Sequence, residues 1–399
     1  MSPGADQDIS TRLIHHPYRA PEDFESPAVP VAKASTVFFP TVADLRARTW
    51  LDRSGYTYGL HGTPTTFTLE ERIATLEGGR HTMLVPSGLA AIAMVDIALL
   101  TQGDHLLLPD NVYGPHKALT RHEVAAWGVT HTVYDPMDPG SLAEAIRPST
   151  RLVWLEAPGS VTLEFPDLRS LVRIVRERAP QAWVALDNTW GAGLAFDAFD
   201  LAPGLGVDLT IHALTKYPSG GGDVLMGAVT CRDDGLYRRL ALSRSRQGQG
   251  VGANDVEAIL RALPSMPLRY AAQDAAARTF AAWCETKPAF VRVLHPALPG
   301  SPGHANWALQ CRAAAGLLAV ELDPRFSPAQ ADAFVDALHL FRIGWSWGGP
   351  VSLAVPYDVR SLRERATAYR GTVVRFSMGL EAVEDLIADA EQALAALPG

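Results

Sequence analysis

The stretch AWVALDNTWGAGLAFDAFDLAPGLGVDLTIHALTKY, residues 182–217, decides the fold. Its two short apolar runs, Ala182–Leu186 and Val207–Ile211, each predict a buried strand of a parallel sheet. Asp187 directly follows the first run, and Lys216 stands just beyond the second. Because ligands bind at the carboxyl ends of the strands in open α/β sheets, we expect both side chains at one ligand-binding edge.

A carboxylate and an amine at one edge of a sheet suit a site for pyridoxal phosphate (PLP). The lysine amine would form a Schiff base with the cofactor, and the carboxylate would keep the pyridine nitrogen protonated so that the ring accepts electrons. The same residues also fit ordinary roles, because Asp187-Asn188-Thr189 could be a helix cap or turn and Lys216 a solvated surface charge. Taken alone, the pair favours the ordinary roles.

Length and composition restrict the class of protein. The 399 residues are too many for one core and enough for two domains, and the formal net charge of -8 argues against nucleic-acid binding. The N-terminus is polar and the longest apolar run is interrupted by Asp96, so we expect neither a signal peptide nor a membrane span. No cluster has metal-ligand spacing, and we expect a cytoplasmic protein with three reduced thiols: Cys231, Cys284 and Cys311.

Hydrophobic periodicity divides the chain into three predicted parts. From about residue 67, strands alternate with helices, which predicts βαβ units and an α/β fold with a mostly parallel sheet. After about residue 233, long helices and a weaker set of strands predict a smaller α+β domain: Val291–Leu294, Gly316–Glu321, Phe341–Gly344 and Thr372–Phe376. We therefore place an N-terminal arm at residues 1–60, a large domain at 61–255 and a C-terminal domain at 256–399. Aromatic residues in the arm favour packing on a neighbouring subunit over disorder.

Further candidate residues stand at turns and in one apolar strand. Pro86-Ser87-Gly88-Leu89 lies between a strand and a helix, where backbone N–H groups bind phosphate, although a plain serine cap is also possible. Tyr113 follows a strand and could stack on a flat ring or simply pack. Arg375 lies in an apolar strand and needs an anionic partner, either a substrate carboxylate or a protein acid. Three other segments are ordinary turns when each is taken alone: Glu156–Ser160, Tyr56–Thr65 and Trp345–Gly349.

The order of these motifs along one chain resembles the Cys/Met-metabolism family of fold-type I PLP enzymes, and within it the bacterial cystathionine β-lyases. The resemblance runs from about Val31 to the C-terminus, including stretches without chemistry such as residues 294–300. It implies that Lys216 carries PLP and later moves protons between Cα and the departing sulfur. It further implies that Asp187 pairs with the pyridinium nitrogen and that Tyr113 stacks on the ring.

The resemblance also implies the remaining binding residues. The cofactor phosphate would be bound at the helix start and beside the lysine, by Ser87, Gly88, Leu89 and Thr215. A neighbouring subunit would add Tyr58, so the chain is expected to form a homo-oligomer, with a dimer as the minimal unit and a tetramer as the common state. Arg375 would bind the substrate α-carboxylate, with Ser346 and Trp347 beside it.

The implied reaction is α,β-elimination of L-cystathionine to homocysteine, pyruvate and ammonia. Three segments favour this β-lyase branch over the γ-synthases and γ-lyases: Glu156-Ala157-Pro158-Gly159-Ser160, Asn188-Thr189-Trp190 and Ser346-Trp347. A cysteine-conjugate lyase or a cysteine desulfhydrase would use the same residues and stays open, as does a γ-enzyme. A catalytically inactive relative that serves as a binding protein is opposed by the presence of the lysine, the aspartate and the arginine.

Three positions depart from the family pattern. Leu60 stands where an arginine usually follows the phosphate-binding tyrosine, which should weaken PLP retention unless His61 or another cation substitutes. Gly221 replaces the histidine of a G-H-S-D motif, and Trp345 replaces a tyrosine before S-W-G-G. These last two leave the preferred thioether open.

Overall fold

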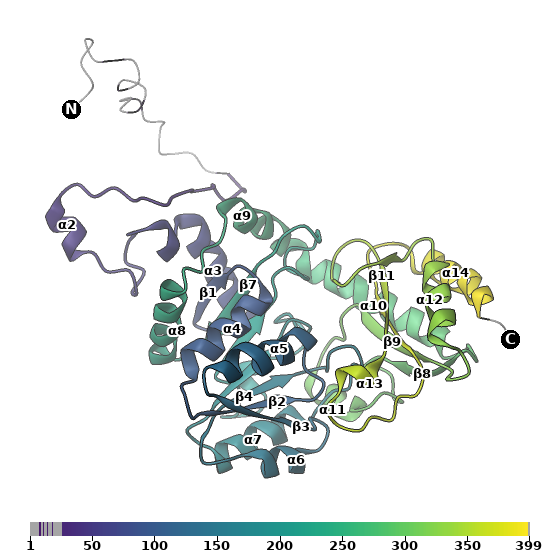
Figure 1. Cartoon of the computed structure of the whole chain (residues 1–399). Helices are drawn as coiled ribbons and strands as arrows, with labels where there is room; N and C mark the ends of the chain where they lie inside the picture. The colour runs from purple at the N-terminus through teal and green to yellow at the C-terminus, as the bar shows by residue number, and fades with distance from the viewer. Residues whose placement is uncertain (1–7, 9–10, 12–13, 15–17, 19–25, 398–399) are drawn as a thin grey trace.

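Two β-sheets organise the part of the chain that the computed structural model describes, which comprises residues 8, 11, 14, 18 and 26–397 (Figure 1). The larger sheet has seven strands in the order β1-β7-β6-β5-β4-β2-β3, and the smaller has five in the order β10-β11-β12-β9-β8. The predicted α/β fold with a second, smaller sheet domain is therefore confirmed. The predicted boundaries at residues 60 and 255 stay predictions.

The large sheet is mostly parallel, as its apolar strands predict. Its strands are β1 (His81–Val85), β2 (His105–Pro109), β3 (Thr130–Tyr134), β4 (Thr150–Glu156), β5 (Trp183–Asp187), β6 (Leu209–His212) and β7 (Gly227–Cys231). Strands β3, β2, β4, β5 and β6 pair in parallel, whereas β7 runs antiparallel to both β1 and β6. The parallel strands therefore bring their carboxyl ends to one edge.

Helices cover both faces of this sheet, so side chains of each strand are buried alternately on either side. Trp154 and Ala185 pack in one core with α4 (Gly88–Leu99) and α8 (Asp234–Arg246). Val153 and Val184 pack in the other core, which includes α6 (Pro139–Ala145) and α7 (Leu168–Arg178). Helices α3 (Pro64–Glu77) and α9 (Ala253–Ala262) pack together in a further core beside β1 and β7.

The smaller sheet packs against helices from the second half of the chain. Its strands are β8 (Phe290–Leu294), β9 (Leu317–Leu322), β10 (Arg342–Ile343), β11 (Leu353–Tyr357) and β12 (Val373–Ser377). Phe280 of α10 (Met266–Cys284), Phe334 of α12 (Pro328–Asp336) and Leu386 of α14 (Val383–Ala393) form its core. Four of these strands were expected from the sequence. Strand β11 was not, because Pro356 interrupts its short run and proline usually argues against a strand.

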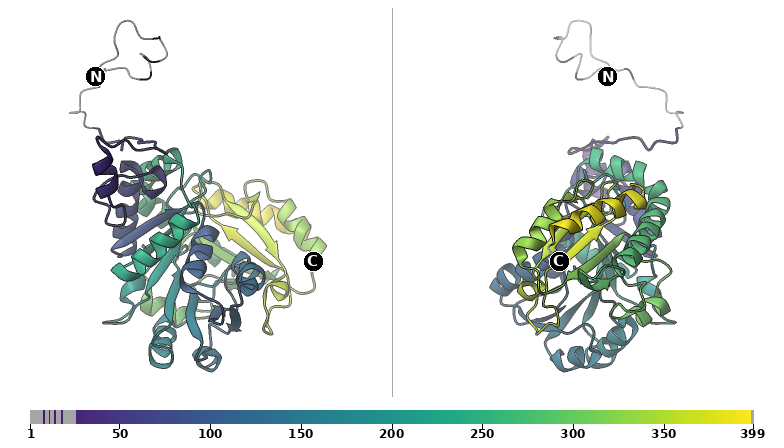
Figure 2. Two further views of the ribbon diagram at one scale, coloured as in Figure 1. Left: turned by 60° about the vertical axis from the view of Figure 1, so that its left-hand side comes forward. Right: turned by 90° about the vertical axis from the view of Figure 1, so that its right-hand side faces the viewer.

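The described part of the arm lies beside the large sheet, away from the smaller one (Figure 1 and Figure 2). It contains α2 (Val42–Ala47), which has no buried residue, and a short 3-10 turn, η1 (Gly59–His61). Most of the arm's first 25 residues lie outside the described part, so the predicted contact with a neighbouring subunit stays a prediction for them. Within the described residues, no helix is long and apolar enough to cross a membrane.

Candidate active site

The ends of β4 and β5 place two carboxylates side by side, because Glu156 and Asp187 are partners in the parallel register. The Glu156 carboxylate accepts a 2.8 Å hydrogen bond from the backbone N–H of Tyr113, and Asp187 accepts one of 2.9 Å from the N–H of Thr189. Burial raises the pKa of Glu156 well above its usual range, and the Asp187 charge raises it further. Burial also raises the pKa of Asp187, although the Thr189 hydrogen bonds oppose this. A ligand cation beside the two acids would offset the free-energy cost of burying a negative charge there.

Lys216 lies beyond β6, and its amine reaches across to the smaller sheet domain. Its Nζ atom donates a 2.9 Å hydrogen bond to the Ser346 hydroxyl and lies 5.4 Å from the centre of the Trp347 ring. Burial, with the charge of Arg375, lowers the Lys216 pKa to about 8, while Asp187 acts in the opposite direction. A larger fraction of this amine is therefore neutral near pH 7 than of an ordinary lysine, which suits a nucleophile.

A glycine allows the Ser346–Trp347 loop to approach the lysine. Gly348 has a φ of +77°, and a Cβ at this position would lie 2.9 Å from the Tyr217 nitrogen and 3.1 Å from the Lys216 carbonyl carbon. Trp347 packs edge-on against Tyr217, with ring centres 5.4 Å apart. The serine and tryptophan predicted near the substrate thus lie beside the predicted cofactor lysine.

Arg375 lies in β12 and is almost fully buried, at 7% exposure. Its Nη2 atom donates to the Trp345 carbonyl oxygen at 3.3 Å, and its Nε atom has no hydrogen-bond partner in the described part of the chain. Its guanidinium lies 5.4 Å from the centre of the Tyr357 ring. Burial lowers the Arg375 pKa, and only tyrosines oppose this effect. Among the residues that the structure describes, no acid forms an ion pair with this guanidinium, so its free N–H fits a ligand carboxylate.

Tyr113 lies near both the carboxylate pair and Arg375, since the charges of all three residues act on its hydroxyl. It directly precedes α5 (Gly114–Leu119), and 42% of its surface is exposed. Burial raises the Tyr113 pKa, the charges of Asp187 and Glu156 raise it further, and Arg375 opposes them. An exposed aromatic ring near the carboxylate pair is available to stack on a planar ligand.

The predicted phosphate turn precedes α4. The Ser87 hydroxyl accepts a 3.0 Å hydrogen bond from the Ala90 N–H, so the serine is a helix cap. A Cβ on Gly88 would lie 2.7 Å from the Ala213 Cβ atom, which shows how closely this turn approaches the segment that carries Lys216. The helix start and the lysine therefore belong to one region.

The two remaining residues predicted to bind the cofactor phosphate are Thr215 and Tyr58. The Thr215 hydroxyl donates to the Met226 carbonyl oxygen at 3.2 Å and accepts from the Met226 N–H at 3.1 Å. Tyr58 forms a bridge with Thr36, and its ring centre lies 6.2 Å from that of His61. Tyr58 is 48% exposed, and no described contact joins it to the other candidate residues of its own chain.

The two substrate-side departures from the family pattern stand next to residues that contact the lysine. Trp345 precedes Ser346, and Gly221 follows Gly220, whose N–H donates to the Lys216 carbonyl oxygen at 3.1 Å. Trp345 is 75% exposed and lies edge-on to Tyr357, with ring centres 5.7 Å apart. In the glycine run, the Gly222 nitrogen would lie 3.7 Å from a Cβ atom added to Gly349. Both changes are therefore placed where they can alter the space around a ligand.

A buried clamp beside Tyr113 was not expected from the sequence. The Lys117 amine donates to the Asp110 carboxylate at 2.7 Å and to the Leu362 carbonyl oxygen at 2.8 Å. The same carboxylate accepts from the backbone N–H groups of Glu364 and Arg365, at 2.9 and 3.2 Å. The clamp joins the loop that carries Tyr113 to the segment preceding β12. No sequence signal identified it, because its halves are about 250 residues apart.

These residues define a class of protein. One edge of the α/β sheet presents a buried lysine of lowered pKa, a pair of carboxylates and the start of a helix. These are the groups that a PLP-dependent enzyme needs. The chain belongs to the Cys/Met metabolism PLP-dependent enzyme family, whose description matches residues 10–395.

Individual relatives agree with this assignment. The chain is 38% identical to "Cystathionine beta-lyase" of Bordetella avium, over 99% of each chain. It is 34% identical to "Cystathionine beta-lyase" of Salmonella typhimurium, over 96% of this chain and 97% of the relative. Among solved structures, it resembles cystathionine gamma synthase from Xanthomonas oryzae pv. oryzae in complex with aminoacrylate and cysteine. The TM-score is 0.83 at 28% identity, over 92% of this chain and 93% of the other. The protein is thus a PLP-dependent enzyme.

Proposed function

We propose that this protein is a carbon–sulfur β-lyase that cleaves L-cystathionine to homocysteine, pyruvate and ammonia. The observation that carries this proposal is the Lys216 amine, which is hydrogen-bonded to Ser346 and has a pKa lowered by burial and by the charge of Arg375. This arrangement offers a base and a carboxylate-binding cation to the same small molecule. The names of the two bacterial relatives support the β-lyase over other reactions of the family.

Each residue contributes a separate step. Arg375 binds the substrate α-carboxylate through its Nε–H, which has no partner among the described residues, and this contact orients the Cα–H bond. PLP, when bound, supplies an electron-accepting ring that makes this Cα–H bond acidic. Lys216 removes the proton from Cα, the Cβ–S bond breaks with its electron pair on sulfur, and the lysine returns a proton to the leaving thiolate. Water then hydrolyses the remaining three-carbon unit to pyruvate and ammonia.

The other residues hold the cofactor. When PLP is bound, Asp187 would pair with its ring nitrogen, and Tyr113 would stack on the ring and contact the substrate. The cofactor phosphate would be held at the start of α4 and beside Lys216, by Ser87, Gly88, Leu89 and Thr215. Ser346 and Trp347 line the substrate side.

We further propose a homo-oligomer in which Tyr58 of one subunit binds the cofactor phosphate of its neighbour. Large apolar side chains of the arm are left open in the single chain, at 93% exposure for Phe38, 61% for Val42 and 54% for Leu45. A second copy of the chain would cover these side chains. Because Tyr58 would complete the neighbour's phosphate site, a dimer would be the minimal active unit, and a tetramer is the expected assembly. The cysteines of the described residues form no disulfide, which is typical of the reducing cytoplasm.

Product analysis tests the reaction. The purified holoenzyme is incubated with L-cystathionine, and both carbon fragments are identified. Homocysteine with pyruvate supports the proposal, whereas cysteine with 2-oxobutyrate would assign the protein to the γ-lyases. Pyruvate from cysteine, cystine or S-alkylcysteines, with none from cystathionine, would point instead to a cysteine desulfhydrase or a cysteine-conjugate lyase.

A further inference from the structure

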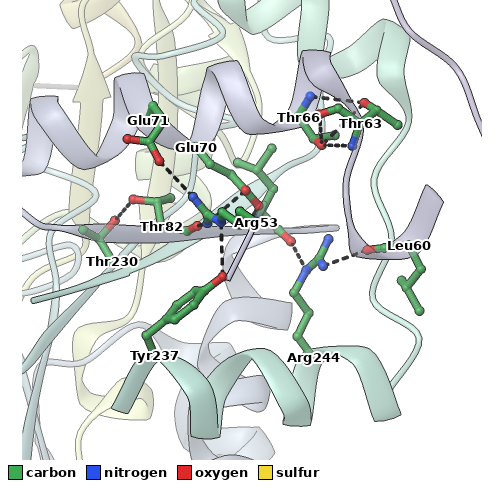
Figure 3. A network of polar contacts seen from close by, with 11 residues as sticks. Arg53, Leu60, Thr63, Thr66, Glu70, Glu71, Thr82, Thr230, Tyr237 and Arg244 are labelled. Atoms are coloured by element: carbon green, nitrogen blue, oxygen red, sulfur yellow. Dashed lines mark hydrogen bonds and ion pairs between the residues drawn. The ribbon is translucent and has the colours of Figure 1, made fainter. Parts of the chain in front are cut away.

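Two arginines fasten the loop that carries Tyr58 to the large sheet of its own chain (Figure 3). The first is Arg53, whose guanidinium is mostly buried, with 16% of its side chain exposed. It forms ion pairs of 3.0 Å with two acids of α3 and donates hydrogen bonds to a phenol of α8 and a carbonyl oxygen of β1: Glu70, Glu71, Tyr237 and Thr82. One side chain thus connects the loop to three elements.

The second is Arg244 of α8, which is 7% exposed. Its Nη1 atom donates to the carbonyl oxygen of Leu60 at 2.9 Å, and its Nε atom donates to the carbonyl oxygen of Leu84 at 2.6 Å. Leu60 is the residue that replaces the family's arginine. Arg244 therefore binds the main chain of this loop, whatever side chain stands at position 60.

Glu70 connects the two arginines through β1. One carboxylate oxygen pairs with Arg53, and the other accepts a 3.2 Å hydrogen bond from the Leu84 N–H. The backbone N–H of Leu84 therefore donates to Glu70, and its carbonyl oxygen accepts from Arg244. Leu84 lies three residues before Ser87, so the loop is held against the strand that leads into the phosphate turn.

The backbone of the loop also depends on these contacts. Arg53 has a φ of 54°, in the left-handed region that non-glycine residues rarely occupy. Such a conformation persists only where the surroundings hold it. Here the surroundings are the contacts of the Arg53 guanidinium itself, five residues before Tyr58.

We propose that Arg53 and Arg244 are positioning residues for the cofactor site of the neighbouring subunit. They fix the loop of residues 53–62 on β1, so that Tyr58 presents its hydroxyl at a defined height to the neighbour's phosphate group. This inference rests on the proposed function, in which Tyr58 acts across the subunit interface. The contacts that support the loop lie within one chain, whereas the proposed effect is on PLP binding in the other chain.

Hybrid dimers test this directional effect. Lys216→Ala disables the covalent PLP site of one chain, so that only the other chain of the hybrid takes up the cofactor covalently. In the first hybrid, the disabled chain also carries Arg53→Met with Glu70→Gln, which leaves no buried carboxylate unpaired. In the second hybrid, these two substitutions are placed in the chain with the intact lysine. PLP affinity is measured by titrating each apo-hybrid and following the absorbance of the bound cofactor.

We expect the dissociation constant for PLP to rise about tenfold or more in the first hybrid, because one charge-assisted or hydrogen-bonded contact to phosphate is lost, and to stay unchanged in the second. Equal weakening in both hybrids, or weakening in the second alone, would overturn the proposal. Arg261→Met is the matched control, since Arg261 forms an exposed ion pair with Glu257 and should change neither hybrid.

Two further variants keep the outcome interpretable. Arg244→Lys retains the charge but cannot reach Leu60 and Leu84 together, so it should reproduce the directional effect if the Arg53 variant does not fold. Tyr58→Phe hybrids are titrated in parallel. If Tyr58→Phe acts across the interface and neither arginine variant does, only the present inference fails. If Tyr58→Phe acts within its own chain, the cross-subunit part of the proposed function fails.

Discussion

Glu156 and Asp187 end adjacent parallel strands as register partners, so two buried carboxylates share one edge of the large sheet. Such a pair does not readily carry two charges. Burial and the charge of Asp187 favour the protonated form of Glu156. Burial raises the pKa of Asp187 as well, and the hydrogen bonds from Thr189 oppose this rise. Because the proposed function needs a charged Asp187 beside the pyridinium nitrogen, we expect Glu156 to hold the proton of the pair.

This division predicts unequal effects of two similar substitutions. Asp187→Asn removes the charge that would hold the pyridinium nitrogen protonated, and kcat should fall by at least about 10²-fold. Glu156→Gln resembles the protonated acid and retains an oxygen that can accept from the Tyr113 N–H, so kcat should change less than about threefold. Steady-state kinetics on both holoenzymes decide this. A larger loss for Glu156→Gln than for Asp187→Asn would reverse the assignment.

The assignment of the cofactor lysine predicts the loss of one covalent bond. Lys216→Ala should abolish borohydride-dependent attachment of PLP to the chain and reduce kcat by about 10⁴-fold, because the amine acts as both anchor and base. Intact mass before and after borohydride reduction measures the attachment. Lys287→Ala is the control, since Lys287 pairs with Glu391 in the second half of the chain. Retained attachment in Lys216→Ala would show that another amine carries the cofactor.

The pH dependence of cofactor capture should follow the Lys216 amine. Only the neutral amine attacks the PLP aldehyde, and the Lys216 pKa is about 8. The rate of PLP capture by the apoenzyme should therefore rise as the pH increases through about 8 and then level off. The charge of Arg375 contributes to lowering the pKa of Lys216, so Arg375→Leu should move the midpoint to higher pH.

Arg375→Lys provides the control for this shift because it retains the positive charge. Its midpoint should stay close to that of the wild-type chain. Both variants should raise KM for L-cystathionine by about 10²-fold, because neither retains the guanidinium fork for the α-carboxylate. An unchanged midpoint in Arg375→Leu would mean that the charge of Arg375 does not contribute to the lowered pKa of the lysine.

Gly348 supplies a test of geometry beside the lysine. Gly348→Ala forces a Cβ to within 2.9 Å of the Tyr217 nitrogen, and the displaced backbone should reduce kcat by on the order of 10²-fold. Gly248→Ala is matched in backbone conformation, with a φ of +66° compared with +77°, but its Cβ would meet nothing within 4 Å. Each substitution should cost roughly 1–2 kcal/mol of stability for the left-handed conformation. Thermal unfolding and kinetics together separate this shared cost from the loss specific to position 348.

The central part of the fold is readable from the sequence because its strands are buried on both faces. The run Ala182–Leu186 predicted β5 to within one residue, and Val207–Ile211 predicted β6 to within two. The position of Asp187 at a strand end followed directly. Less regular segments were harder. The helix expected from Pro115 to Trp127 is present, but α5 passes into a π-helical turn, η2 (Thr120–Val124), which apolar spacing does not reveal.

Contacts between distant segments could not be derived from local patterns. The hydrogen bond between Lys216 and Ser346 joins residues 130 positions apart, and only the family resemblance placed them together. Tyr357, which packs beneath Arg375, gave no signal because its strand was not expected. The contact of Arg53 with Tyr237 spans 184 positions, and neither residue belongs to a motif. Long-range polar networks of this kind require the folded chain.

The hydrogen bond from Arg244 to the carbonyl oxygen of Leu60 separates two properties that are usually linked. A main-chain acceptor is present in every amino acid, so this hydrogen bond can form whichever side chain stands at position 60. In the proposed dimer, a substitution at position 60 is therefore expected to change the charge offered to the neighbour's cofactor while the attachment of the loop to α8 is kept.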